Sequence, residues 1–373
     1  MVKMELFEYK EVLEATDNFS QSRIIGKGSH GSIFLATFPK LLAVVKKSHN
    51  HNLIIENEVR ILLSLLSHNN INNNNHIINL IGTSQDSVST HRVIILEFMP
   101  NGSLHDSLHV IKTPPSWPKR LEIVLQIAAA VKFLHRSGII HRDIKSENVL
   151  FDSDWVAKLA DFGLAVEEFP GEAVPPAGTI GYLDPCYTTS SKLSTKNDVF
   201  SFGVLVLEIL SGRKAMEISN KTTSTDIREW ALPLIEKRQW NELYDKRIPF
   251  PNGGDDVARG LKELAYVAAS CVSLDEDCRP CMIDVVDGII RRSQQKRQQV
   301  GRIWSSVLRN VMLVRMIKGQ NGKLVKRCRF SSGIEYCEEE EEEATNHVSK
   351  GNNNKKIVLL RDLILADDHD HTN

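Results

Sequence analysis

The stretch IHRDIKSENVL, at residues 140–150, contains the most informative pattern of polar side chains in the chain. Asp143 follows a His-Arg pair, and Asn148 comes five residues later. A carboxylate at this place is suited to orient an attacking hydroxyl and accept its proton, and an amide oxygen is suited to bind a divalent cation. Lys145 lies between them, where it can stabilise negative charge on a transferring group. These are the requirements of phosphoryl transfer.

A second acidic motif, KLADFG at residues 158–163, begins after a short apolar run that favours a β-strand. Asp161 lies eighteen residues after Asp143 and is placed to hold a magnesium ion between the β- and γ-phosphates of a nucleotide. A surface turn is the alternative for any Asp-Phe-Gly sequence. The distance from residues 140–150 favours the metal site over the turn.

A glycine-rich segment, GKGSHGSI at residues 26–33, stands upstream of both motifs. Glycines at this spacing let two strands and their turn close over phosphates and offer them backbone N–H groups. Dinucleotide-binding folds share the spacing, but there a helix follows, whereas here the β-type residues IFLA follow. No Gly-Lys-Ser/Thr closes the segment, which excludes a Walker loop.

Lys46 ends the apolar run at residues 41–45, thirteen residues after Ile33. Lys46 either only marks the edge of a strand or binds the α- and β-phosphates of a nucleotide, and the preceding glycines favour the second interpretation. A phosphate-binding lysine needs a carboxylate to hold it in place. Glu58 supplies one within a helical pattern, with Glu56 as the alternative.

The motifs stand in the order and spacing of protein kinases, and the chain resembles the plant receptor-like cytoplasmic kinases. These belong to the receptor-like/Pelle kinase family, within which the Crinkly-related group is the most similar. The resemblance runs from about Phe7 to Arg292. Its further segments are FEYKEVLEATDNFS at residues 7–20, EFMPNGSL at 97–104, GTIGYLDP at 178–185, DVFSFG at 198–203 and CRPCM at 278–282.

The resemblance implies an α+β fold, the bilobal protein kinase fold, with a small, mainly β N-lobe that contains one key helix and a larger, mainly helical C-lobe. Residues 1–22 form an N-terminal lead-in. The kinase domain spans residues 23–292, with the lobes meeting near residues 98 and 99. Residues 293–373 form a C-terminal tail.

The implied activity is transfer of the γ-phosphate of ATP to serine or threonine hydroxyls of protein substrates, with Mg²⁺ as the cation and Mn²⁺ as its substitute. The resemblance places signalling downstream of plant receptor kinases, with an upstream receptor kinase as partner. Lys145 and Thr179 form the pattern of serine/threonine kinases. The alternative function class is a pseudokinase scaffold, which has typically lost one of four residues that this chain keeps: Lys46, Asp143, Asn148 and Asp161.

The roles implied for single residues fall into four groups. The catalytic residues are Lys46, Glu58, Asp143 and Lys145. The ATP-binding residues are Ile25, Gly26, Lys27, Gly28, Gly31, Ile33, Lys46, Glu97 and Met99; of these, the segment at Glu97 is the hinge whose backbone groups bind adenine. The metal ligands are Asn148 and Asp161. Thr179 belongs to the substrate loop, and Asp198 and Arg279 are structural, Asp198 bracing the catalytic loop.

Cys186 departs from the family pattern, in which a glutamate follows this proline and pairs with the buried arginine that matches Arg279. A buried guanidinium without a partner costs several kcal/mol. Either another carboxylate replaces the glutamate, or Arg279 reaches solvent. The candidate carboxylates are Asp184, Asp275 and Asp277.

Arg142 precedes the catalytic aspartate, and kinases with this arginine usually hold it with a phosphorylated residue of the activation loop. Residues 164–178 contain no serine, threonine or tyrosine. We expect one of the acidic side chains, Glu167, Glu168 or Glu172, to pair with Arg142 and give partial constitutive activity. The alternative is phosphorylation of Thr179.

The composition of the chain bears on its partners and its location in the cell. A net charge of −1 gives no reason to expect binding to nucleic acid. The six cysteines show no disulfide framework, and neither a signal peptide nor a run of 18 apolar residues occurs. We therefore expect a cytoplasmic protein.

The tail is basic at residues 291–329, with twelve Lys or Arg residues and no acidic one, and is acidic at residues 338–343. Apolar residues including Trp304 recur in the basic part at helical spacing. Three interpretations stay open. The helix docks on the C-lobe, binds calmodulin, or binds an anionic membrane surface such as the plasma membrane.

Overall fold

The computed structural model describes residues 5–28, 31–48, 53–67, 76–86, 92–168, 174–187, 189, 193–219, 223–251, 256–294, 317–318 and 324–325. The chain divides into two compact units, residues 1–317 and 318–373. The last described elements are the two-residue strands β13 (Ile317–Lys318) and β14 (Leu324–Val325). Most of the tail, including Trp304, therefore lies outside the described residues, and its three interpretations remain predictions.

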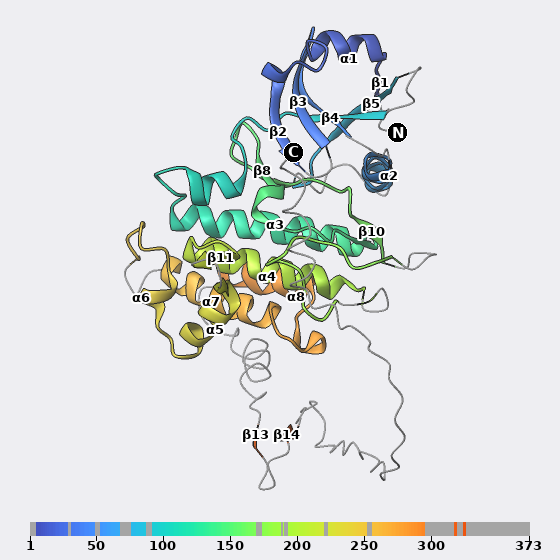
Figure 1. The fold of residues 1–373 in the computed structure, drawn as a ribbon. Coiled ribbons are helices and arrows are strands. Elements are labelled where there is room, and N and C mark those ends of the chain that lie inside the picture. The colour runs from blue at the N-terminus through green and yellow to red at the C-terminus, as the bar shows by residue number, and fades with distance from the viewer. Residues whose placement is uncertain are drawn as a thin grey trace, which may run out of the picture. The chain divides into compact units, whose positions relative to one another are not determined.

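The N-lobe is built on a six-stranded sheet in the order β1-β5-β6-β4-β3-β2 (Figure 1). Its strands are β1 (Glu5–Leu6), β2 (Ile24–Gly28), β3 (Gly31–Phe38), β4 (Leu41–Lys47), β5 (Leu80–Gln85) and β6 (Arg92–Glu97). All neighbours are antiparallel except β1, which runs parallel to β5. The apolar run before Lys46 forms the central strand β4, so the lysine lies in the middle of the sheet and not at its edge.

Helix α2 (Leu53–Ser67) is the one long helix described between these strands, and it contacts β5 and β6. Its apolar residues recur at helical spacing and are buried: Ile55, Val59, Leu62 and Leu65. Glu58 lies within this buried stripe. The packing of the stripe against the sheet therefore turns a carboxylate toward Lys46.

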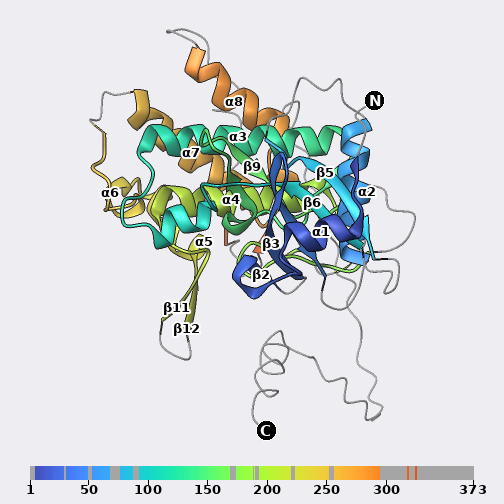
Figure 2. The ribbon, with the colours of Figure 1, turned by 90° about the horizontal axis from the view of Figure 1, so that it is seen from above.

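The lead-in packs on the sheet. Helix α1 (Tyr9–Ala15) contacts β3 and β5, on the face of the sheet that Figure 2 shows from above. Val12, fully buried, joins Phe38 and other sheet residues in a second, smaller apolar cluster. The rings of Phe7 and Phe38 lie 4.9 Å apart.

We expect Val12→Ala to lower the free energy of unfolding by about 1.5 kcal/mol, since two buried methyl groups are lost. Lys10→Ala on the same helix is the matched control, because its side chain is 82% exposed. Urea denaturation measures both variants. Equal stability of the two would show that α1 does not contribute to the core of the N-lobe.

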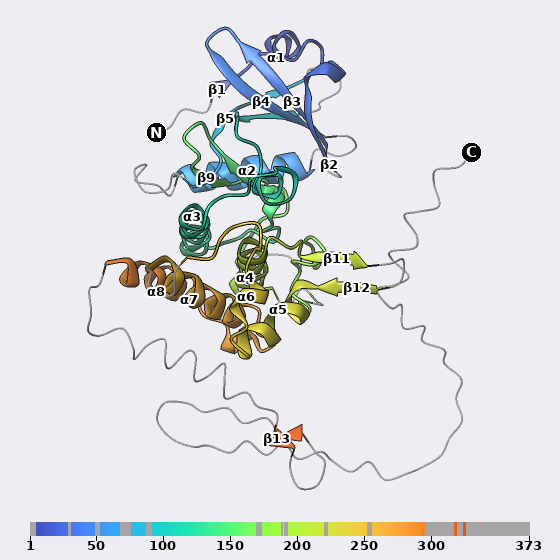
Figure 3. The same cartoon turned by 90° about the vertical axis from the view of Figure 1, so that its left-hand side faces the viewer.

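The C-lobe is mainly helical (Figures 1 and 3). Its helices are α3 (Trp117–Arg136), α4 (Thr195–Ser211), α5 (Ile227–Glu236), α6 (Trp240–Leu243), α7 (Asp256–Cys271) and α8 (Met282–Gln294). Helix α4 is buried from Asn197 to Ser211 and contacts α3, α5 and α7, which makes it the centre of the lobe. The hairpin of β11 (Met216–Ser219) and β12 (Thr223–Asp226) extends away from α4 in Figure 3. The predicted bilobal kinase fold is confirmed.

The predicted catalytic motifs lie between short strands in the part of the chain that joins α3 to α4. The strands are β7 (Ile139–Ile140), β8 (Val149–Phe151), β9 (Ala157–Leu159) and β10 (Val166–Glu167). β8 pairs with β9, and β10 pairs with β7. Within the described ranges no helix is both long and apolar enough to cross a lipid bilayer.

Candidate active site

Lys46 and two carboxylates form the upper part of the site. The Nζ atom of Lys46 lies 2.8 Å from Oε2 of Glu58 and 2.7 Å from Oδ1 of Asp161. Burial alone would lower the pKa of Lys46, but the two carboxylates outweigh burial and hold that pKa above its usual range. The lysine therefore stays a cation. Its partner on α2 is Glu58 and not the alternative, Glu56.

The catalytic loop brings three side chains to one point. Oδ1 of Asp143 accepts a 2.6 Å hydrogen bond from the hydroxyl of Thr179. The Nζ atom of Lys145 donates to that hydroxyl at 2.8 Å and lies 2.9 Å from Oδ2 of Asp143. Nδ2 of Asn148 donates to the backbone oxygen and to Oδ2 of Asp143. Both of these bonds use the amide nitrogen, which leaves the amide oxygen of Asn148 as the atom suited to a cation.

Asp198 holds the backbone of this loop from the side of α4. Its carboxylate is fully buried and accepts 2.8 Å hydrogen bonds from the backbone N–H groups of His141 and Arg142. Arg142 has a φ of 70°, a conformation that costs energy in a residue other than glycine. Two backbone hydrogen bonds to one carboxylate keep the loop in this geometry.

The pKa of Asp198 reports on the same contacts. Burial alone would raise the pKa of its carboxyl, but the hydrogen bond from His135 and the interactions with His141 hold it below its usual range. Because the folded pKa lies below the unfolded one, the ionised carboxylate stabilises the fold above the unfolded pKa, and this contribution is lost as the pH falls through the folded pKa.

We expect the difference in unfolding free energy between wild type and Asp198→Asn to stay constant above about pH 5 and to shrink at lower pH. Urea denaturation at a series of pH values measures this difference. A difference that grows on acidification would contradict the depressed pKa of Asp198.

The described glycines of the glycine-rich segment lie on β2 and β3, with Gly26 opposite Ile33 and Gly28 opposite Gly31. A Cβ atom on Gly31 would lie 2.3 Å from the backbone oxygen of Lys47, so no larger residue fits there. Ile25 and Lys27 lie on β2 with these glycines, and the side chain of Ile25 is half exposed.

The predicted hinge follows β6. The carboxylate of Glu97 accepts hydrogen bonds of 2.9 and 2.8 Å from Nζ of Lys158, and its backbone N–H donates to the oxygen of Asn79 at 3.1 Å. The backbone oxygen of Glu97 is therefore the group suited to contact a nucleotide. Met99 is buried in the main core. Lys158 was not among the predicted site residues, although its position just before the Asp-Phe-Gly motif is a signal that could have identified it.

The donor atoms at Asp161 and Asn148 fit a hard divalent cation, which prefers carboxylate and amide oxygens. The side chain of Asp161 is 30% exposed, so part of it is accessible beside its contact with Lys46. In the part of the chain that the structure describes, no three His, Cys, Asp or Glu side chains gather as a metal cluster. A cation at these two residues would therefore need phosphate or water oxygens to complete its coordination.

Arg279 is paired. Its guanidinium contacts both carboxylate oxygens of Asp184, with the Nη2–Oδ1 distance at 3.0 Å, and both side chains are fully buried. Of the alternatives left open by Cys186, Asp184 is thus the carboxylate that replaces the glutamate. The thiol of Cys186 instead contacts the backbone oxygen of Leu274.

Arg142 is held by backbone oxygens and not by the acidic side chain that the sequence predicted. Its guanidinium donates to the backbone oxygens of Leu164, at 3.2 Å, and of Pro175. Glu167 was wrongly predicted to pair with it, because the Glu167 carboxylate lies 2.6 Å from Arg60 of α2. No ion pair joins Arg142 to Glu168 within the described ranges, and Glu172 lies outside them.

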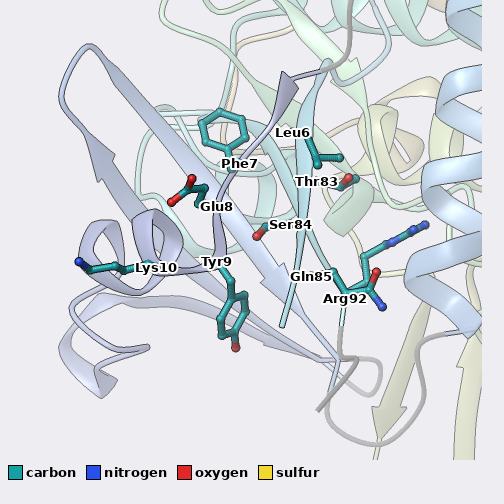
Figure 4. A pocket seen from close by; sticks show the side chains of 9 residues that line it. All are labelled: Leu6, Phe7, Glu8, Tyr9, Lys10, Thr83, Ser84, Gln85 and Arg92. Carbon is teal, nitrogen blue, oxygen red and sulfur yellow. The ribbon is translucent and has the colours of Figure 1, made fainter. Parts of the chain in front are cut away.

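A cavity elsewhere on the N-lobe is shown in Figure 4. Its lining comes from the lead-in, from β5 and from Arg92 at the start of β6. It lies at the β1–β5 side of the sheet, the opposite edge from β2 and its glycines. None of the predicted catalytic residues lines it.

Comparisons with known proteins agree with this geometry. The family described as protein kinase domain matches residues 19–306. A serine/threonine-protein kinase-like protein of Arabidopsis thaliana is 41% identical over 343 residues, which covers 84% of this chain and 95% of that protein. The probable serine/threonine-protein kinase PBL7 of Arabidopsis is 34% identical over 311 residues, 78% of each chain. A leaf rust 10 disease-resistance locus receptor-like protein kinase-like protein of Arabidopsis is 34% identical over 303 residues, 78% of this chain and 45% of that protein.

Proposed function

Since the chain belongs to the protein kinase family, we propose that Lys46, Asp143, Lys145, Asn148 and Asp161 bind ATP with its cation and transfer the γ-phosphate. The chain is a protein serine/threonine kinase of the plant receptor-like cytoplasmic type. Its substrates are proteins.

One observation carries the assignment of roles. The carboxylate of Asp143 already accepts a hydrogen bond from a threonine hydroxyl, that of Thr179, and Lys145 contacts both groups. A serine or threonine of a substrate presents the same hydroxyl. Asp143 is therefore suited to orient the substrate hydroxyl and to accept its proton as the oxygen attacks the γ-phosphorus.

The other proposed site residues act on the negative charge of the ATP phosphates. Lys46, kept cationic by Glu58 and Asp161, binds the α- and β-phosphates. Lys145 stabilises the charge on the transferring phosphoryl group. Mg²⁺ is the proposed cation, with Mn²⁺ as its substitute; when bound, it neutralises phosphate charge. Asp161 and Asn148 hold it, and the backbone at Glu97 and Met99 together with β2 and β3 surrounds the nucleotide.

The wider setting is also a proposal. We place the kinase domain at residues 23–292, with residues 1–22 as its N-terminal lead-in. The protein acts in the cytoplasm, in signalling downstream of a receptor kinase, and the tail is its candidate contact with calmodulin or with the plasma membrane. The receptor-like kinase names among the relatives support the receptor partner.

Equilibrium titration with ATP tests the site. Wild type is expected to bind ATP more tightly with Mg²⁺ than with EDTA, and Asp161→Asn is expected to lose this advantage because it lacks one charge toward the cation. Lys246→Ala is a control, since Lys246 pairs with Glu242 on the exposed surface of the C-lobe. A full Mg²⁺ advantage in Asp161→Asn would overturn the metal assignment.

A further inference from the structure

Helix α2 is attached to the chain that follows the Asp-Phe-Gly motif by two polar side chains next to Glu58. Nδ2 of Asn57 donates to the backbone oxygens of Gly163, at 3.0 Å, and of Ala165, at 2.8 Å. Nη1 of Arg60 donates to Oε1 of Glu167 at 2.6 Å. Gly163 lies in a turn that the backbone N–H of Ala165 closes on the oxygen of Phe162 at 3.1 Å, and Glu167 lies on the short strand β10 that follows.

Asn57 and Arg60 form one network. Nη2 of Arg60 also donates to Oδ1 of Asn57, at 3.0 Å. An amide has donors on one side and an acceptor on the other, so this bond fixes which way the Asn57 amide faces. Arg60 thereby keeps the donors of Asn57 directed at the two backbone oxygens.

The opposite side of the same segment is attached to the catalytic loop. Val166 and Glu167 form β10, which pairs with β7, the strand that directly precedes His141. The backbone N–H of Glu168 donates to the oxygen of Gly138 at 2.8 Å. The segment therefore links α2 on one side to the catalytic loop on the other.

The approach of α2 to this segment is close. A Cβ atom on Gly163 would lie 2.4 Å from Cγ2 of Ile54 in the first turn of α2. Glu58 follows Ile54 by one turn of α2 and lies 2.8 Å from Nζ of Lys46. Its Oε1 accepts from the backbone N–H of Phe162 at 3.2 Å. Movement of α2 away from the segment would break this bond and the Lys46–Glu58 pair together.

We propose that Asn57 and Arg60 are positioning residues that hold α2 on residues 163–167 and so keep Glu58 on Lys46 without a phosphate in this part of the activation loop. The inference rests on the proposed kinase activity. Residues 164–178 offer no hydroxyl to phosphorylate, and Arg142 is already bound by backbone oxygens. Glu167 does pair with an arginine, but its partner is Arg60 of α2 and not Arg142 of the catalytic loop.

The two residues differ in expected effect. Arg60 and Glu167 are 53% and 55% exposed, and exposed ion pairs contribute little, so Arg60→Gln should lower kcat by about twofold to threefold. The bonds of Asn57 are partly buried. Asn57→Asp keeps the shape but replaces two donors by an acceptor facing two backbone oxygens, and it should lower kcat by about tenfold.

The test uses full-length protein treated with phosphatase, and it measures kcat, KM for ATP and the thermal midpoint. Wild type should be active in this state. Asn57→Asp should lose activity in the wild-type background and lose nothing further in a Glu58→Gln background, because it acts through Glu58. Its thermal midpoint should fall by a few degrees, and by the same amount in both backgrounds, because the same two hydrogen bonds are lost in each. The exposed-surface control Lys246→Ala should change neither kcat nor KM.

Three outcomes would overturn the proposal. The first is equal activity of Asn57→Asp, Arg60→Gln and wild type. The second is a loss of activity in Asn57→Asp that is the same in both backgrounds, which indicates a merely structural role. The third is phosphatase-treated wild type that is inactive until Thr179 is phosphorylated; the proposed function would then stand while the inference failed. Wild type inactive in both states would instead contradict the proposed function itself.

Discussion

Asp161→Ala is expected to reduce phosphoryl transfer by about three orders of magnitude or more while the protein stays folded. The carboxylate is partly exposed and is one of the two proposed cation ligands, so we expect its loss to weaken metal binding. Lys46 remains paired with fully buried Glu58, so no buried charge is left alone. Initial rates of transfer from radiolabelled ATP measure the loss, and circular dichroism checks the fold.

Lys46→Arg is the companion to this variant. The guanidinium keeps the charge but is planar and larger than an ammonium, so it fits neither the space between the two carboxylates nor the phosphates. We expect a loss of several orders of magnitude. Activity near that of wild type in either variant would show that the phosphate and metal sites are wrongly assigned.

Asp184→Ala is expected to have the largest effect on stability, a loss of about 3–5 kcal/mol. It leaves the buried Arg279 guanidinium without a charged partner and also removes the acceptor for Asn197. Chemical denaturation measures the loss. Because replacing both members of a buried ion pair by apolar residues avoids the uncompensated charge, Asp184→Leu with Arg279→Met should be more stable than Asp184→Ala alone.

A double variant that is less stable than Asp184→Ala would show that the pair is not the source of the loss. The variant Lys246→Ala should stay within about 0.5 kcal/mol of wild type, since it removes one member of an exposed ion pair.

The sequence was sufficient for the fold, and the candidate site residues could be selected from it because they stand in short motifs whose order is fixed by the chain; their chemical roles stay predictions. Residues 140–150 form one loop, and Asp161 comes at a set distance after it. The pairing of Lys46 with Glu58 also followed, since a helix that buries an apolar stripe carries its single buried carboxylate to the same side.

Contacts between segments that are far apart in sequence could not be predicted in this way. Whether Asp184, Asp275 or Asp277 meets Arg279 depends on how the substrate loop turns, and several carboxylates were equally available in sequence. The acidic partner of Arg142 was predicted from charge alone. The turn at Gly163 and the strand β10 that follows it instead bring Glu167 to Arg60, and no sequence periodicity indicates that contact.

The packing of the lead-in is a similar case. The family resemblance of residues 7–20 indicated a segment before the domain, but not that Val12 would be fully buried against the sheet. Burial of so short a helix is decided by the apolar face that the sheet leaves open, and only the folded N-lobe has that face.

We propose that Asp143 carries the transfer of phosphate from ATP to serine and threonine hydroxyls. Phosphoamino-acid analysis of purified protein after incubation with labelled ATP and Mg²⁺ tests this role, with Asp143→Asn treated in parallel. We predict labelled phosphoserine and phosphothreonine in wild type and no label in Asp143→Asn. No label in wild type, label on phosphotyrosine alone, or equal label in both proteins would contradict the account.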